Sequence, residues 1–209
     1  MNTKRKAKGI KMKKIICLIL ALACCFTFFA CGETDETLEA YLDVVNATNA
    51  SNITTKTTHT RGDVVYKGMY ETEITEDGFV FTYEYEEKAP VVAGSTTGSV
   101  ITKSGEIVYN GEYYVVNGGE PTTSEPDVAY MSLKLNLTAD TIGDYTLSRD
   151  GSQLTATLSA DQVASIFGTE ISTSSATLTL KIAGGRLLTV KLAYTTNDST
   201  EVLIETSYT

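Results

Sequence analysis

Alternation of apolar and polar residues with a period of two recurs along most of the chain after residue 63 and predicts β-strands. Segment 63–75 places four apolar side chains on one face of a strand: Val64, Tyr66, Tyr70 and Ile74. Segment 79–87 alternates in the same way and places Phe79, Phe81, Tyr83 and Tyr85 on one face. Because the intervening positions are largely polar, the two segments predict an antiparallel hairpin with one side in water.

Similar runs continue to the end of the chain and bring the expected number of strands to about ten. Asn110-Gly111 lies between two such runs and indicates a hairpin with a type I′ turn, in which both central residues have positive φ. Asp150-Gly151 marks a second hairpin. The other strand-like segments are 99–103, 129–137 and three runs within 176–208.

Two segments have helical periodicity instead. An apolar stripe with a period of 3.6 residues predicts a helix near the start of the β-rich region, and its members are Leu38, Tyr41, Leu42 and Val45. Segment 159–168 indicates a short helix, with Ser159 and Gln162 forming a capping box and Gly168 ending it.

These elements predict a mainly β (α+β) fold for residues 37–209, which contain no interior linker that would divide the domain. Strands this numerous and joined by short connections favour a large antiparallel sheet, and a sheet of that size tends to curl. We therefore expect a curled sheet or half-open barrel of about ten strands, with the N-terminal helix and one short helix packed on it.

The N-terminus has the parts of a secretory signal. Residues 1–14 carry seven Lys or Arg and no acidic residue, and residues 15–30 are apolar or small throughout. As a helix, 16 residues extend only about 24 Å, which is less than the hydrocarbon thickness of a membrane. Translation from Met12 would shorten the basic region without changing this interpretation.

All four cysteines lie within the first 31 residues, and Cys31 directly follows Ala30 at the end of the apolar run. This arrangement resembles the lipobox of bacterial lipoproteins, although Phe28 stands where the family usually has Leu, Val or Ile. The resemblance implies a signal peptide at residues 1–30, lipidation of Cys31 and a hydrated tether at residues 31–36. It places the protein on the extracytoplasmic side of the cell membrane. An ordinary cleaved or uncleaved signal is the alternative.

Charge excludes one class of partner. Without residues 1–30 the chain has ten basic and 26 acidic residues, a net charge near −16 over 179 residues. Such a charge repels the phosphates of DNA and RNA, so we expect no nucleic-acid partner. The region after Cys31 has no cysteine, and its stability must come without disulfides.

The expected order of elements resembles that of LolA/LppX-like lipoprotein carriers, in which helices cover an apolar cavity in a half-open barrel. The resemblance implies that a lipid or another apolar small molecule binds in the concave face of the sheet. Tyrosine and phenylalanine suit such a wall, although ordinary core packing also explains them. The expected ligand-binding residues are Leu38, Tyr41, Leu42, Val45, Tyr66, Tyr70, Phe79, Phe81 and Tyr83.

No pattern indicates catalysis, a cofactor or a metal site. His59 is the only histidine, and we expect it in an exposed polar loop before the first strand. Zinc sites need several His or Cys ligands, and no calcium-loop motif is present. A second hypothesis is therefore a surface module without a cavity, whose loops at 88–99 and 117–127 contact another envelope protein. An enzyme that uses two carboxylates comes third.

Overall fold

The computed structural model describes residues 34–88, 99–131, 135, 137–167, 173 and 175–209. The signal segment, Cys31, most of the loop at 88–99 and Gly168 lie outside the described residues. The chain divides into two units, one up to Tyr41 and one from Leu42 to the end. The whole sheet and helices α3 and α4 belong to the second unit.

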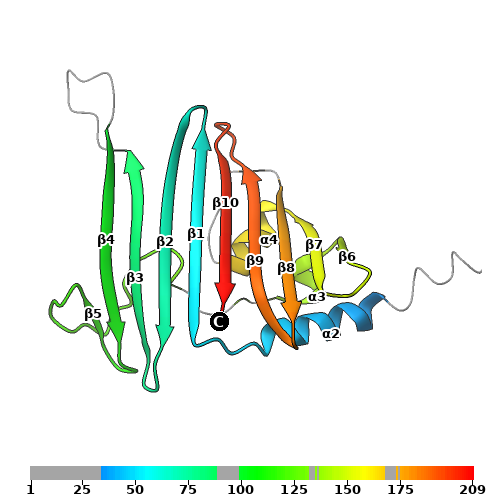
Figure 1. The fold of residues 1–209 in the computed structure, drawn as a ribbon, viewed down its shortest axis with the longest axis horizontal. Coiled ribbons are helices and arrows are strands. Elements are labelled where there is room, and N and C mark those ends of the chain that lie inside the picture. The colour runs from blue at the N-terminus through cyan, green and yellow to red at the C-terminus, as the bar shows by residue number, and fades with distance from the viewer. Residues whose placement is uncertain (1–33, 89–98, 132–134, 136, 168–172, 174) are drawn as a thin grey trace, which may run out of the picture. The chain divides into compact units, whose positions relative to one another are not determined.

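Ten antiparallel strands form one open sheet (Figure 1), which confirms the predicted fold class. The strands are β1 (Asn52–Arg61), β2 (Val64–Ile74), β3 (Phe79–Lys88), β4 (Val100–Tyr109), β5 (Tyr114–Val116), β6 (Tyr145–Leu147), β7 (Gln153–Leu158), β8 (Ala176–Ala183), β9 (Arg186–Thr195) and β10 (Glu201–Tyr208). Their spatial order is β5-β4-β3-β2-β1-β10-β9-β8-β7-β6.

This order joins two meanders through their first and last strands. Strands β1 to β5 make one half of the sheet, and β6 to β10 make the other. The halves meet where β1 pairs with β10, in a register that sets Thr55 opposite Thr206. The two short strands β5 and β6 form the outer edges, so the sheet does not close into a barrel.

The two sheet faces differ as the alternation predicts. Paired residues share a face, and the face that carries Phe81, Ile204 and Leu178 is called here the covered face. Phe81 and Leu178 are fully buried on it. The opposite face, called the open face, is rich in threonine and charged side chains, since Lys56, Glu71 and similar residues point there.

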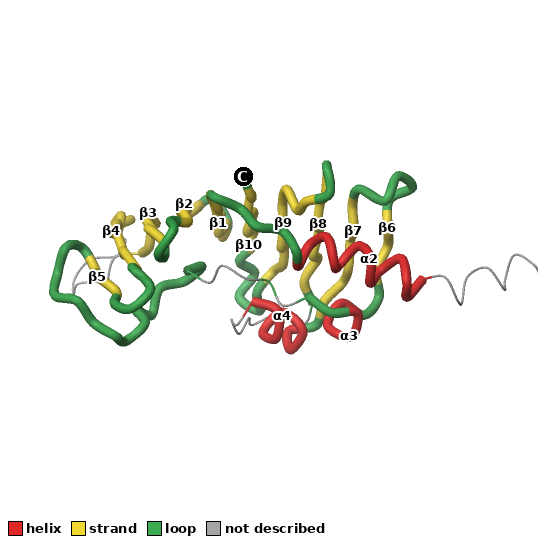
Figure 2. The backbone as a smooth tube through the Cα atoms, turned by 90° about the horizontal axis from the view of Figure 1, so that it is seen from below, coloured by secondary structure: helices red, strands yellow, loops and turns green. Residues whose placement is uncertain are grey.

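Helices α3 (Ala139–Ile142) and α4 (Ala160–Phe167) lie on the same side of the sheet (Figure 2), where both contact β7. The predicted capping box of α4 is confirmed: the Ser159 amide donates to Gln162 Oε1 at 2.8 Å, and the Gln162 amide donates to Ser159 Oγ at 3.3 Å. The short α3, which has no counterpart among the predicted elements, has the same device at Thr138 and Thr141.

The N-terminal helix α2 (Thr34–Asn46) is also confirmed, and its predicted stripe of Leu38, Tyr41, Leu42 and Val45 is buried. The end of α2 is held by side-chain hydrogen bonds. Asn46 donates to the Leu137 carbonyl at 2.9 Å, and just beyond the helix Thr48 Oγ1 accepts from the Leu187 amide at 2.8 Å.

The first strand corrects the prediction of a polar loop before residue 63. β1 is ten residues long and central in the sheet, and Thr55 and Thr57 are buried on it. Threonine is β-branched and fits a strand well, so the run is polar in composition but strand-forming in conformation. His59 therefore lies half-buried in a strand between Val202 and Tyr66, and the prediction of an exposed loop was wrong.

Two further predictions are corrected in detail. The hairpin at Asn110-Gly111 forms, but Tyr109 pairs with Tyr114, so the loop has four residues. Asn110 Oδ1 accepts from the amides of Glu112 and Tyr113, which explains the longer loop. None of the described residues within 129–137 is in a strand, although Met131 and Leu137 are buried.

Candidate ligand pocket

An apolar pocket lies between the covered face and α4, in the middle of the sheet where its two halves meet. Its floor comes from β1, β10 and β9, and its walls come from α4 and from the segment that connects β5 to β6. The enclosed volume is about 100 Å³. Every lining residue belongs to the unit that begins at Leu42.

Strands β1 and β10 supply a floor that is apolar at its ends and polar at its centre. Ile53 pairs with Tyr208, and Ile204 lies farther along β10 on the same face. Between them Thr55 and Thr206 are directly opposite, and their hydroxyl oxygens are 2.9 Å apart. One hydroxyl donates to the other, so each has a hydrogen-bond partner and the pair is tolerated in an apolar floor.

The rest of the pocket is apolar or aromatic. β9 contributes Val190, Leu192 and Tyr194, and α4 contributes Val163, Ile166 and Phe167. Val163 and Ile166 are buried, as the capping box and the apolar face of α4 require. The helix thus presents apolar side chains to the strands across the pocket.

Tyr130 closes the pocket on the side of the β1–β5 half. Its backbone has φ of 63°, a conformation that is costly for a bulky residue. Its ring lies 4.8 Å from the Tyr70 ring, and Leu135 continues the wall beyond it. The positive φ ends the extended run that the sequence predicts at 129–137 and turns the Tyr130 ring onto the sheet.

No Lys, Arg, His, Asp or Glu is among the described residues that line the pocket. Its titratable groups are the phenols of Tyr130, Tyr194 and Tyr208. Burial raises the pKa of all three, to about 12 for Tyr208, because the charged phenolate is poorly solvated inside the protein. The part of the lining that the structure describes is therefore electrically neutral at physiological pH and offers hydroxyl donors.

The volume limits what enters without rearrangement. Cavities that hold a whole drug-sized ligand enclose about 300–1,000 Å³, and an apolar cavity near 150 Å³ admits benzene. At about 100 Å³, this pocket accommodates an apolar group somewhat smaller than a benzene ring. A longer ligand must extend out of it or displace α4.

The residues predicted to bind a ligand do not line this pocket. The five from the strands share the covered face of β2 and β3, where Tyr70 and Phe81 form a core cluster with Ile107 and Met131. Tyr66, Phe79 and Tyr83 are half-buried on the same face. Leu38, Tyr41, Leu42 and Val45 are on α2. Tyr70 lies behind the lining, since its ring contacts that of Tyr130.

Glycines let the tyrosines of that cluster lie against the sheet. A Cβ on Gly105 would collide with the Tyr83 ring, and one on Gly68 would meet Thr57 Oγ1 at 2.6 Å and the Tyr70 ring at 2.9 Å. Tyr83 and Gly105 are cross-strand partners, so the ring covers the neighbouring backbone. These aromatic side chains pack as a core on the β2–β5 half of the sheet. The void therefore lies in the centre of the sheet.

Several pocket residues have no functional signal in the sequence. Ile53 and Thr55 lie on the strand whose composition predicts a loop, and Tyr130 lies in the segment whose alternation predicts a strand. The signal that could have found the floor is the alternation of Val190, Leu192 and Tyr194. The matching apolar positions on β10 complete it.

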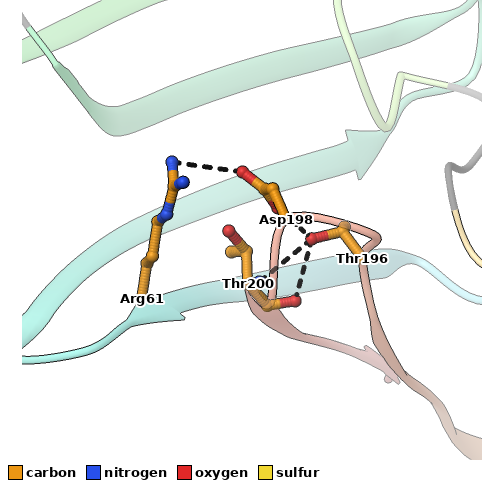
Figure 3. A network of polar contacts seen from close by, with 4 residues as sticks. All are labelled: Arg61, Thr196, Asp198 and Thr200. Carbon is orange, nitrogen blue, oxygen red and sulfur yellow. Dashed lines mark hydrogen bonds and ion pairs between the residues drawn. The ribbon is translucent and has the colours of Figure 1, made fainter.

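Other polar groups form structural networks. Arg61 Nη1 lies 3.2 Å from Asp198 Oδ2, and Asp198 also accepts from the Thr196 hydroxyl (Figure 3). Hydrogen bonds from Thr196 and Thr200 are the main reason that the pKa of Asp198 is lowered, with Arg61 adding to them. The network joins the β1–β2 turn to the β9–β10 turn, so Arg61-Gly62-Asp63 is a structural turn.

Burial lowers the pKa of His59, which favours the neutral imidazole. Among the described residues, no group of three or more His, Cys, Asp or Glu is arranged to hold a metal ion. The described helices include none with the length and apolar composition of a membrane span.

Comparison of the chain with protein-family models finds no match, and comparison with curated proteins finds none either.

Proposed function

We propose that this protein is a lipid-anchored extracytoplasmic lipoprotein that binds an apolar or amphiphilic small molecule on the covered face of its sheet. It acts by binding, without catalysis. The observation that carries the proposal is the apolar pocket between α4 and the β1–β10–β9 floor. We include in this proposal the resemblance to LolA/LppX-like carriers.

The lining supports binding better than catalysis. Ligand sites combine apolar walls with a few polar groups that fix orientation. Here Ile204, Leu192 and Ile166 supply the apolar surface, and the hydroxyls of Tyr194 and Tyr208 supply polar ends. General acid–base catalysis needs groups whose pKa lies near the working pH, and burial has moved these phenols away from it.

The anchor follows from the N-terminal sequence. Two acyl chains on Cys31 give durable membrane attachment, because each buried CH₂ contributes about 0.8 kcal/mol. Such an anchor would keep the domain at the membrane, which suits a protein that takes up or delivers an apolar compound there.

Pocket filling tests the binding proposal. Ile204→Phe places a larger side chain in the pocket, and Leu203→Phe makes the same kind of change on the open face of the same strand. Small molecules that co-purify with the full chain are extracted and quantified by mass spectrometry. We expect wild type and Leu203→Phe to carry the same compound, and Ile204→Phe to lose it.

Equal amounts of every extracted compound in the two variants would contradict the proposal. Circular dichroism of both variants establishes that each retains its β-sheet, because overpacking costs about 1–3 kcal/mol and need not unfold the domain.

The second candidate function is a surface interaction module. Three apolar side chains favour it, because Val65, Met69 and Val100 are 41, 44 and 48 % exposed on the open face. A partner from the cell envelope would cover them. Crosslinking in intact membranes distinguishes the candidates: a partner lost with Met69→Lys but retained with Ile204→Phe supports the module.

A further inference from the structure

We propose that the pocket selects uncharged amphiphiles, an apolar group that carries an alcohol, ketone or ester oxygen, over carboxylates such as fatty-acid anions. This inference rests on the proposed function and names the ligand class of the same pocket. Two features of the described residues support it. The basic side chains on the neighbouring strands lie outside the lining, and tyrosine hydroxyls within the lining can donate hydrogen bonds.

Among the described residues, the basic side chains on the neighbouring strands lie outside the pocket lining. Lys56 and Lys191 lie on β1 and β9, but the register places both on the open face, behind the floor of the pocket. Arg61 is on the covered face at the end of β1, where it pairs with Asp198 at 3.2 Å. His59 is on that face too, outside the lining, and burial favours its neutral form.

A carboxylate that entered the pocket would therefore lose its hydration without meeting a positive charge on any lining residue that the structure describes. Burial of an unpaired charge is far more costly than burial of a hydrogen-bonded neutral group. The excess of acidic residues in the chain adds long-range repulsion to that local cost.

The tyrosine hydroxyls in the lining can donate hydrogen bonds to an uncharged ligand. Among the described residues, the phenols of Tyr194 and Tyr208 make no hydrogen bond with protein groups, and burial is the sole cause of their raised pKa. Each can donate its proton to a ligand oxygen. One of the Thr55 and Thr206 hydroxyls donates to the other, so the donating hydroxyl has no proton left for that oxygen.

The test uses three probes with the same number of carbons: 1-hexanol, methyl pentanoate and hexanoate. The chain has no tryptophan, so Phe167→Trp supplies one fluorescent reporter at the pocket, and Leu203→Trp supplies a control on the open face. Each variant is the full chain in phosphatidylcholine vesicles at pH 7, with empty vesicles as the blank.

We expect the alcohol and the ester to change the fluorescence of the Phe167→Trp variant in a saturable way, at concentrations about tenfold lower than hexanoate requires. The control reporter should respond to none of them beyond the blank. Removal of two hydroxyls by Tyr194→Phe and Tyr208→Phe, in the Phe167→Trp background, should weaken the alcohol several-fold.

Hexanoate that binds as tightly as hexanol, or more tightly, overturns the selectivity and leaves the proposed function standing. Failure of all three probes with the Phe167→Trp reporter, when an Ile166→Trp reporter is equally silent, overturns the proposed function itself. An unchanged alcohol affinity after removal of both hydroxyls overturns the assignment of the phenols as the donors.

Discussion

Of the residues in the pocket wall, Tyr130 has the least ordinary backbone conformation. A positive φ is unfavourable for a bulky residue and persists only where surrounding contacts enforce it. The Tyr70 ring, whose centroid lies 4.8 Å from that of Tyr130, supplies one such contact, and Tyr130 lines the pocket beside it. The ring of Tyr130 thus separates the aromatic core of the β2–β5 half from the central void.

Truncation at this position should be costly. Tyr130→Ala retains the strained backbone and loses the ring, so we expect the free energy of unfolding to fall by about 2–3 kcal/mol. Tyr130→Phe keeps the ring and should remain within about 1 kcal/mol of wild type. Urea unfolding followed by circular dichroism measures both, and equal losses in the two variants would show that the hydroxyl, not the ring, matters.

The buried phenols predict alkaline sensitivity. Burial raises the pKa of Tyr208 to about 12 in the folded protein, while an exposed tyrosine titrates near 10. Because the folded-state pKa is raised, this contribution to stability is complete below about pH 10 and is lost as the pH rises toward 12. Absorbance of phenolate at 295 nm should therefore appear at higher pH in the native protein than in guanidinium.

Tyr208→Phe supplies the control for that titration. It should reduce the native absorbance change above pH 11 and make unfolding less dependent on pH between 10 and 12. Tyr113, which is 37 % exposed and outside the pocket lining, provides the matched tyrosine-to-phenylalanine substitution as a control.

Among the strands, β1 is the one that makes a single sheet out of two meanders. Its covered face carries Ile53 and two buried threonines in place of large apolar residues, and it pairs with β2 and β10 over most of its length. Small side chains at this point leave space above them. Thr55 lines the pocket, so the side chain that suits the strand also leaves space for the void.

The Thr55–Thr206 contact predicts a non-additive result. Thr55→Val leaves the Thr206 hydroxyl without its partner and should cost about 1 kcal/mol, as should Thr206→Val. In the double variant no hydroxyl is left unpaired, so its loss should be smaller than the sum of the single losses. A double-mutant cycle of urea unfolding measures the coupling, and strict additivity would contradict the hydrogen bond between the two hydroxyls.

Most elements could be predicted from the sequence because their periodicity and caps are local. The faces of β2, β3 and β8 to β10 follow from alternation, and Ser159 and Gln162 identify the start of α4. The threonine-rich β1 escapes prediction because apolar alternation is weak there, although β-branched residues fill it. The end of the run at Tyr130 escapes it because a positive φ has no sequence signature in tyrosine.

For the chain as a whole, the pairing of its first and last strands was beyond sequence reasoning. That pairing is long-range, with Ile53 opposite Tyr208, and it brings β1, β10 and β9 together as one floor. Without knowledge of the β1–β10 pairing, the sequence favours the aromatic strands β2 and β3 as the ligand site. Many of those aromatic side chains instead pack in the core, and the void lies beside them.

Membrane attachment predicts a lipid label on one thiol. In a bacterial host grown with labelled palmitate, the wild-type chain should incorporate the label, because Cys31 follows the small residue Ala30. Cys31→Ala should lose the label, while Cys25→Ala should keep it. Label that persists after Cys31→Ala would contradict the assignment of the anchor.

The most direct test of a ligand-accessible void is a crystal of the protein under xenon pressure, because xenon enters small apolar cavities and is located by its electron density. The structure predicts a xenon atom between Ile166 of α4 and Ile204 of β10. It also predicts that Ile204→Phe excludes the atom while Leu203→Phe does not. Wild-type crystals with no xenon at this position, and a side chain such as Phe167 filling it, would contradict the account.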